Sequence, residues 1–249
     1  MDAPLTVGIL GGMGPAAAID LMAQVLRRSP RGSEQDGVRL IVDNNPRVPD
    51  RNAAILRGAP SPAPVLAQMA QGLERAGADV LAMACNTAHA FQFEIERSVG
   101  IPFVSMIEEA SAQAAALAEG RGRTVGLLAG DGCIAAGLYQ AELGRRGLAC
   151  LSPEPWAQAQ FMTMLYDIKA GDQSAAMSRR IAVIAAGLEA AGADLLIAAC
   201  TEVPLVLDAG MTAAPLINST EALAAALVDY ALRRRPLPPP FTSTEVGEA

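Results

Sequence analysis

Residues 78–89 read ADVLAMACNTAH, an apolar run that ends in a cysteine and is followed at once by hydrogen-bonding side chains. An apolar run of roughly four to eight residues is typical of a buried strand in a parallel sheet. Cys85 would then lie at the carboxyl end of that strand, where open α/β sheets bind their ligands. Because a buried cysteine is often only a small apolar side chain, this assignment needs support from the rest of the chain.

The chain repeats this stretch. Residues 72–85 and 187–200 are identical at ten of fourteen positions, with Cys85 aligned on Cys200. Two shorter stretches recur in the same order, 6–12 as 124–130 and 101–104 as 214–217. In each case the two copies lie much farther apart along the chain than the repeat period of a solenoid, which is roughly 20–50 residues. We therefore predict an α/β protein of two similar lobes related by duplication, with both cysteines lining the cleft between them.

The composition excludes several classes of protein. A hydrophobic content of 51% with only 18% charged residues predicts a packed globular chain. A net charge of −7 argues against a nucleic-acid partner, which would need a basic surface. The four cysteines lack short paired spacings, which indicates free thiols in a reducing compartment. Without a recognisable signal peptide or membrane-length apolar run, we expect a cytoplasmic protein that does not contact membranes.

Composition shifts along the chain suggest its domain limits. We expect a first lobe over 1–119 plus 219–235, a second lobe over 120–218 and a disordered, proline-rich tail over 236–249. Besides the two strands before the cysteines, hydrophobic runs predict strands at 5–10, 38–42, 100–105, 124–128, 148–151 and 215–218. The same patterns predict helices at 16–28, 65–76, 108–117, 135–146, 161–171, 175–191 and 220–234.

The glycine-rich turn at 11–15 precedes the first helix, whose free N–H groups suit a carboxylate or phosphate. Residues 12–17 also fit G-x-G-x-x-A, the outline of a dinucleotide site, with Asp43 ending the next strand. Pro15 lies awkwardly inside that fingerprint, and Asp43 is farther away than the usual ~20 residues. A dinucleotide enzyme is therefore the weakest alternative, and we expect no cofactor.

A polar, proline-stiffened loop at 43–51 ends in Arg51, whose guanidinium suits a carboxylate ligand. His89, the only histidine, follows Cys85 by about one helical turn. Together with Cys85 and Cys200 it would make an incomplete zinc site without a fourth ligand. We therefore expect a structural role for His89 and no metal.

Two thiols in one reduced cleft suit paired acid–base chemistry. A cysteine hydrolase would want a well-placed histidine and would leave the second thiol unexplained. In the paired scheme one thiolate removes a proton from a carbon while the opposing thiol delivers one to the other face, which inverts the centre. We expect a helix amino end to lower the pKa of each thiol, and backbone N–H groups with Asn86, Thr87 and Thr201 to stabilise the developing charge.

Four motifs in this order resemble the aspartate/glutamate racemase family: GILGGMGP (8–15), NPRVPDR (45–51), MACNTAH (83–89) and AACTEVPL (198–205). The similarity covers about residues 5–234. It implies two flavodoxin-like lobes, catalysis by Cys85 and Cys200 without pyridoxal phosphate, and a homodimer. Arg51 and Lys169 match the residues associated with the distal carboxylate of aspartate.

The resemblance assigns further residues to a small acidic amino acid. The turn at Met13, together with Asn86, Thr87, Thr201 and Glu202, is expected to bind it. The chain departs from the family pattern at the second-lobe turn, where Gly130 and Cys133 replace a threonine-rich sequence, and at 198–199, Asn218 and Leu223. None of these changes removes a catalytic group, but they bear on which amino acid is bound.

The sequence therefore predicts an amino-acid racemase, with aspartate as the expected substrate and glutamate as a second choice. Two alternatives stay open: an isomerase or decarboxylase of a small dicarboxylate, similar to maleate isomerase, and a non-catalytic protein that binds small acids. Replacing either cysteine would distinguish the racemase from the binding protein, because a binding protein would tolerate the loss of either thiol.

Overall fold

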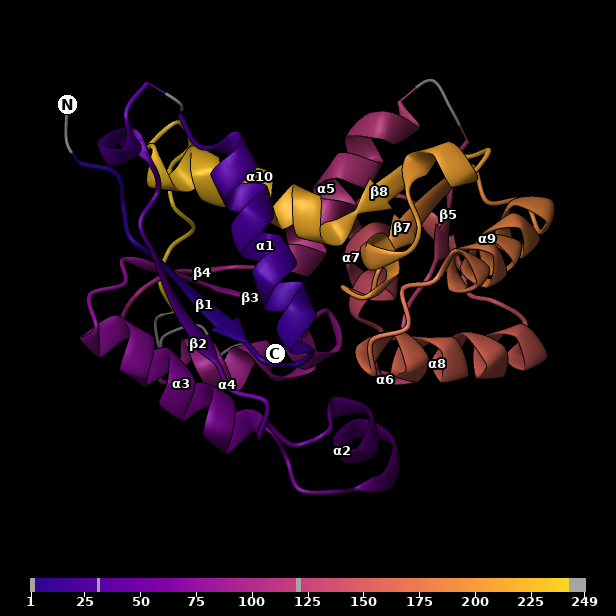
Figure 1. The fold of residues 1–249 in the computed structure, drawn as a ribbon, viewed down its shortest axis with the longest axis horizontal. Coiled ribbons are helices and arrows are strands. Elements are labelled where there is room, and N and C mark those ends of the chain that lie inside the picture. The colour runs from indigo at the N-terminus through magenta and orange to yellow at the C-terminus, as the bar shows by residue number, and fades with distance from the viewer. Residues whose placement is uncertain (1–2, 31, 120–121, 242–249) are drawn as a thin grey trace.

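Two four-stranded parallel sheets lie side by side, each with its own helices, in the computed structural model of residues 3–30, 32–119 and 122–241 (Figure 1). The first sheet has the strand order β2-β1-β3-β4 and the second has the equivalent order β6-β5-β7-β8. The predicted α/β class with two similar lobes is confirmed.

The first lobe is built around a sheet whose two central strands are buried along their whole length. Its elements are β1 (Val7–Gly11), α1 (Pro15–Arg28), η1 (Glu34–Asp36), β2 (Leu40–Asn44), α2 (Arg51–Arg57), α3 (Ala63–Arg75), β3 (Val80–Met83), η2 (Thr87–Phe91), α4 (Gln92–Glu96) and β4 (Phe103–Val104). Helices α1 and α10 pack on one face of the sheet, and α3 and α4 pack on the other.

The second lobe repeats this plan. The elements that follow β4 along the chain are α5 (Met106–Ala118), β5 (Thr124–Leu127), α6 (Asp131–Ala135), α7 (Leu138–Arg145), β6 (Ala149–Leu151), α8 (Pro155–Lys169), α9 (Ala175–Ala190), β7 (Leu195–Ala198), η3 (Val203–Leu205), η4 (Ala209–Met211), β8 (Leu216–Asn218) and α10 (Ser219–Ala231). Helices α8 and α9 cover one face of its sheet, while α5 and α7 cover the other. Because α10 returns to pack against α1, it joins the two lobes.

The duplication extends to a matched pair of glycines in the central strands. Gly8 pairs with Leu81 across the first sheet, and Gly126 pairs with Leu196 across the second. A Cβ on Gly126 would lie 2.7 Å from Leu196 Cδ2 and 3.1 Å from Leu188 Cβ, and Gly8 meets its own neighbours as closely. The missing side chain therefore lets a helix pack tightly on each strand.

Replacing Gly126 with alanine should lower the free energy of unfolding by about 1–3 kcal/mol, because the added methyl group overpacks the core. The matched control is Gly187→Ala in α9, where a new Cβ has no neighbour within 4 Å and should stabilise the helix by about 0.5–1 kcal/mol. Denaturant unfolding of both variants measures this difference. A stable Gly126→Ala protein would contradict the close helix–strand packing.

Several predicted boundaries are wrong: α8, for example, begins at Pro155 rather than at residue 161. The loop predicted to run to Arg51 ends one residue earlier, because Asp50 Oδ1 accepts from the Ala53 N–H at 2.6 Å and caps α2. The helix predicted over 135–146 is two helices, since Gly137 adopts a left-handed φ of +65° between α6 and α7. Of the predicted lobe junction at 120–123, residues 120–121 lie outside the described ranges.

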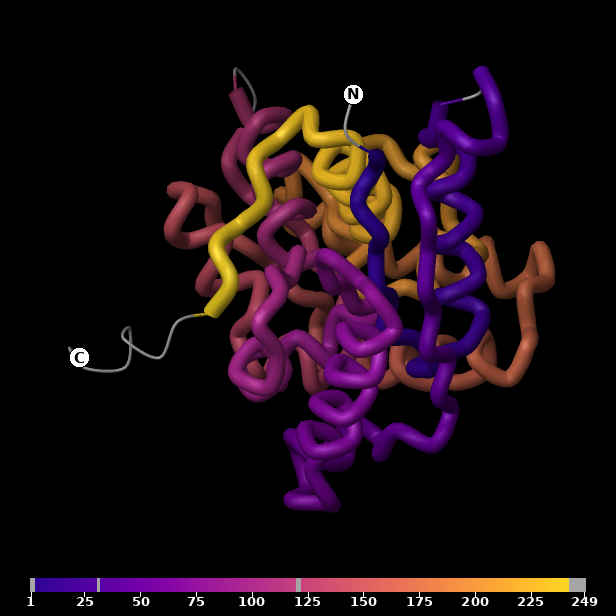
Figure 2. Tube along the Cα trace, turned by 90° about the vertical axis from the view of Figure 1, so that its left-hand side faces the viewer, coloured from indigo at the N-terminus to yellow at the C-terminus, as the bar shows by residue number. Residues whose placement is uncertain are grey.

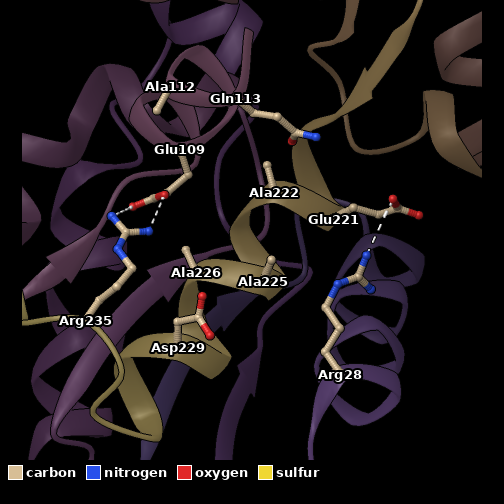
Figure 3. Close-up of a pocket in the computed structure, with 10 residues that line it drawn as sticks. All are labelled: Arg28, Glu109, Ala112, Gln113, Glu221, Ala222, Ala225, Ala226, Asp229 and Arg235. Atoms are coloured by element: carbon tan, nitrogen blue, oxygen red, sulfur yellow. Dashed lines mark hydrogen bonds and ion pairs between the residues drawn. The ribbon is translucent and has the colours of Figure 1, made fainter. Parts of the chain in front are cut away.

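Two ion pairs flank an alanine-lined groove of about 300 Å³ along α10 (Figure 3). Arg28 of α1 meets Glu221 at 3.5 Å near the amino end of α10. At the opposite end, Arg235 meets Glu109 of α5 at 2.9 Å. The side chain of Asn218 also caps the helix by accepting from two backbone N–H groups. The amino end of α10 is thus tied to the first lobe.

After α10 the chain runs back along the first lobe (Figure 2). Leu237 packs against the core of that lobe, and the Phe241 ring lies 5.4 Å from the ring of Phe93. Of the tail predicted to be disordered, residues 242–249 lie outside the described part of the chain. Within the described ranges, no helix combines the length and apolar character needed to cross a membrane.

Candidate functional site

The two cysteines occupy equivalent positions in the two lobes. Cys85 follows β3 by two residues and Cys200 follows β7 by two residues. Both strands are central in their sheets. Because each cysteine comes just after its strand, both thiols lie at the carboxyl edge of a sheet, where ligands bind in this class of fold. Each side chain is buried, with 6% of Cys85 and 9% of Cys200 exposed, and both are free thiols.

Glu202 is a hydrogen-bond partner of the Cys200 thiol. The thiol donates to Glu202 Oε2 at 3.0 Å, and the hydroxyl of Thr201 donates to the same oxygen at 3.3 Å. The backbone of Gly14 approaches the other carboxylate oxygen so closely that a Cβ there would lie 2.8 Å from Oε1. Glu202, expected to bind substrate, is therefore in direct contact with a thiol.

The expectation that each thiol has a lowered pKa is wrong for Cys200. Burial and the negative charge of Glu202 raise the pKa of Cys200 well above its ordinary value, against the opposing charge of Lys169. Cys200 is therefore a protonated thiol near neutral pH, which makes it a proton donor in the ligand-free protein.

Lys169 is the last residue of α8, and its ammonium lies near Glu202 and Tyr166. Its Nζ is 3.8 Å from Glu202 Oε1 and 5.8 Å from the centre of the Tyr166 ring. Burial lowers the pKa of Lys169, but Glu202, Cys200 and Cys85 together outweigh it, and the net shift is upward. The ammonium is therefore placed to stabilise negative charge on either cysteine.

Arg51 is held in place by backbone oxygens. Its guanidinium donates to Met13 O at 3.0 Å, Pro49 O at 3.1 Å and Val48 O at 3.4 Å. The Nε–H group is buried and has no hydrogen-bond partner. Met13 and Arg51, both expected at the site, are thus brought together, and an unpaired donor remains for a ligand.

Thr87 lies against the altered turn of the second lobe. A Cβ on Gly132 would lie 3.0 Å from Thr87 Cγ2 and 2.7 Å from Asn52 Oδ1. The amide of Asn52 accepts from the Gly132 N–H at 2.8 Å and donates to Tyr166 at 3.4 Å. The glycine therefore allows a close contact between the lobes.

Asn86 makes its contacts with other side chains of the protein. Its Oδ1 accepts from the Tyr139 hydroxyl at 2.7 Å, and its Nδ2 donates to Ser219 Oγ at 3.1 Å. Sequence reasoning missed both partners, as well as Asn52. Ser219 directly follows a strand, so it could have been predicted in the same way as the cysteines, from its place at the carboxyl end of that strand. Tyr139 lies inside a helix, and no local sequence pattern marks it.

His89 has the structural role expected of it. Its Nε2 accepts from the Met106 N–H at 3.1 Å, so Nδ1 carries the proton and donates to Cys85 O at 2.8 Å. Burial lowers the pKa of His89 to about 4. The neutral ring therefore joins the Cys85 turn to the first turn of α5.

This environment predicts a pH-dependent stability. In the unfolded chain His89 has the ordinary pKa of a histidine, about 6.5, whereas in the folded protein its pKa is about 4. Because the unfolded state binds the proton first, stability falls as the pH drops through this window, by about 3 kcal/mol in all. Denaturant unfolding between pH 7 and 5 should show about 2 kcal/mol of this loss, and His89→Gln should remove it. An equal loss in both proteins would contradict a buried neutral ring.

The remaining thiols differ in their surroundings. Cys133 is buried, and this burial, with a smaller effect from Cys85, raises its pKa to about 12. Cys150 is half-buried in the edge strand β6. Among the described residues, no group of three or more His, Cys, Asp and Glu side chains is arranged to hold a metal ion.

Known proteins share this fold and sequence. A family model described as Asp/Glu/hydantoin racemase matches residues 10–227. The broad specificity amino-acid racemase RacX of Bacillus subtilis (strain 168) is 27% identical over 237 residues, covering 89% of this chain and 96% of that protein.

Solved structures agree with this match. An aspartate racemase from Picrophilus torridus is 30% identical with a TM-score of 0.80, covering 91% of this chain and 94% of that one. A putative Asp/Glu racemase from Yersinia pestis, 23% identical with a TM-score of 0.77, covers 92% of this chain and 99% of its own and shares the fold.

Proposed function

The chain belongs to the Asp/Glu/hydantoin racemase family, and we propose that it inverts an amino acid by passing the Cα proton between Cys85 and Cys200. The observation that carries this proposal is the equivalent placement of two buried thiols in duplicated lobes. Lys169 supports it, because negative charge on either cysteine would raise the pKa of this ammonium and be stabilised by it in turn.

In one direction the reaction starts with Cys200 as a protonated thiol. The Cys85 thiolate takes the proton from Cα and becomes a thiol, leaving the electron pair on the substrate carbon. The Cys200 thiol then gives its proton to the opposite face of that carbon and becomes a thiolate. In the reverse direction Cys200 must first lose its proton, and Glu202 is in contact with the thiol to accept it. No pyridoxal phosphate takes part in this scheme.

The substrate we propose is an acidic amino acid, with aspartate first and glutamate second. Arg51 offers a buried, unpaired N–H, and Lys169 adds a positive charge beside the thiols. A guanidinium and an ammonium together suit a side-chain carboxylate. The similarity to an aspartate racemase favours aspartate, while that to a broad specificity enzyme favours a wider range.

The α-carboxylate and the charge that develops on it need hydrogen-bond donors. We propose the backbone around Met13 and the side chains of Thr87 and Thr201 for this role. Asn86 contributes through its one amide hydrogen that is not used by Ser219. These donors act where charge appears during proton removal, which is where they lower the barrier most.

The wider organisation is proposed on the family resemblance and on the packing of α10. The first lobe would comprise 1–119 plus 219–235, and the second would comprise 120–218. A cytoplasmic homodimer is the form we propose for the working enzyme. Sedimentation of the reduced protein tests the dimer.

The substrate proposal is tested by a panel of single enantiomers: aspartate, glutamate, alanine and lysine. Reduced protein is incubated with each one without added cofactor, and the opposite enantiomer is followed by chiral chromatography. We expect the highest kcat/KM for aspartate. A faster reaction with alanine or lysine than with either acid would contradict the roles of Arg51 and Lys169.

A further inference from the structure

A chain of three buried hydrogen bonds connects the two cysteine turns. The Tyr139 hydroxyl donates to Asn86 Oδ1 at 2.7 Å, Asn86 Nδ2 donates to Ser219 Oγ at 3.1 Å, and Ser219 Oγ donates to Ala198 O at 2.7 Å. We propose that Tyr139 and Ser219 are positioning residues that hold the two thiols in register for proton transfer. This inference rests on the proposed two-cysteine reaction.

Two members of this chain, Asn86 and Ala198, lie next to the cysteines. Asn86 immediately follows Cys85 in the first lobe. Ala198 is the last residue of β7 and precedes Cys200 by two residues in the second lobe. A shift of one turn relative to the other therefore strains or breaks one of the two hydrogen bonds that Ser219 makes. Two-base inversion needs the sulfur atoms on opposite faces of one carbon, so this relative position matters.

The direction of each of the three hydrogen bonds follows from the donors and acceptors available. Ser219 has a single hydroxyl hydrogen, which it gives to Ala198 O, so it accepts from Asn86. Tyr139 and Ser219 are fully buried, and only 2% of Asn86 is exposed. Burial raises the pKa of Tyr139 well above its ordinary value, so its hydroxyl keeps the donated hydrogen. Water cannot easily replace any of these partners.

Ser219 is also held in place by its position at the start of α10. It is the first residue of α10, and the ion pair of Arg28 with Glu221 secures that end of the helix (Figure 3). Tyr139 comes from α7, a different element of the second lobe. The amide plane of Asn86 is thus held from two independent helices. Loss of either contact frees this side chain to rotate and loosens the turn that carries Cys85.

Tyr139→Phe removes one hydroxyl and retains the ring. In this variant we expect kcat for L-aspartate to fall about tenfold or more, with KM changed by less than about twofold, because geometry rather than binding is lost. In deuterium oxide, deuterium in the unconverted L-aspartate should increase relative to the D-aspartate formed. This happens because, once the two thiols are out of register, the second thiol delivers its proton more slowly than the first thiol returns one.

That ratio separates positioning from general destabilisation, because a smaller folded fraction lowers exchange and inversion by the same factor. Tyr230→Phe is the matched control: its hydroxyl contacts Glu109 and Arg235 at the far end of α10. We expect this control to leave both the ratio and kcat unchanged. Ser219→Ala provides a second test if Tyr139→Phe folds poorly, and should raise the ratio in the same direction.

The two substitutions together should be less harmful than the product of their separate effects, since both disturb one network. A wild-type protein that racemises aspartate, with a ratio unchanged in both Tyr139→Phe and Ser219→Ala, would overturn the positioning role alone. A wild-type protein that neither exchanges nor inverts any amino acid in the panel would overturn the proposed function, and this inference with it.

Discussion

Replacing Cys200 with serine should abolish racemisation, with a fall in kcat of roughly 10³-fold or more, while Cα–H exchange continues for one enantiomer. A serine hydroxyl is too weak an acid to replace a thiol in proton transfer, and such a contribution is typically worth about 10²–10⁴ in rate. Cys85 keeps its access to one face of the substrate carbon. Deuterium exchange of each enantiomer, followed by NMR, measures this selectivity.

The reciprocal variant should show the reciprocal selectivity. Cys85→Ser should also stop inversion, and any residual exchange should belong to the other enantiomer. The two variants together would assign each thiol to one stereoisomer. The matched control is Cys150→Ser, the same change in the half-buried edge strand β6, which should racemise at the wild-type rate. Full inversion by either Cys85→Ser or Cys200→Ser would exclude a two-base reaction.

Glu202→Gln should lower kcat/KM by about ten- to hundredfold and move the basic limb of its pH profile to lower pH. The rate falls because the Cys200 thiol loses a charged hydrogen-bond acceptor, an interaction worth about 1.5–3 kcal/mol. The limb moves because the carboxylate raises the pKa of both Cys200 and Lys169. Removing that charge lets each group lose its proton at a lower pH.

Because L- and D-aspartate have equal free energies, kcat/KM must fall equally in the two directions, which gives an internal check. Glu109→Gln is the control, since Glu109 is also ion-paired, with Arg235, but lies away from the thiols. It should keep the wild-type profile. A basic limb that stays in place in Glu202→Gln would show that neither Cys200 nor Lys169 determines it.

Local sequence pattern was sufficient for the fold and for the strand-end cysteines. The apolar runs before Cys85 and Cys200 became central strands, because residues buried on both faces of a parallel sheet must be continuously apolar. The duplication was visible because both copies kept the same close packing, for example at Gly8 and Gly126. Chain order then gave the same sheet topology twice.

What the sequence could not show depends on contacts between distant residues. Tyr139 and Asn86 are 53 positions apart, and Asn86 and Ser219 are 133 apart, so no local spacing links them. The raised pKa of Cys200 has the same origin, because burial by the folded chain opposes the effect expected from a helix end. Helix boundaries failed for a smaller reason: single residues, Asp50 and Gly137, decide them.

The most direct test of the two-thiol reaction uses the reduced wild-type protein and L-aspartate in deuterium oxide, without added cofactor. NMR follows the Cα proton, and chiral chromatography with mass detection follows D-aspartate. We expect D-aspartate to form with deuterium at Cα, because the donating thiol equilibrates with solvent. D-aspartate that keeps its original proton, or a folded protein with titratable thiols that gives neither exchange nor inversion, would contradict the account.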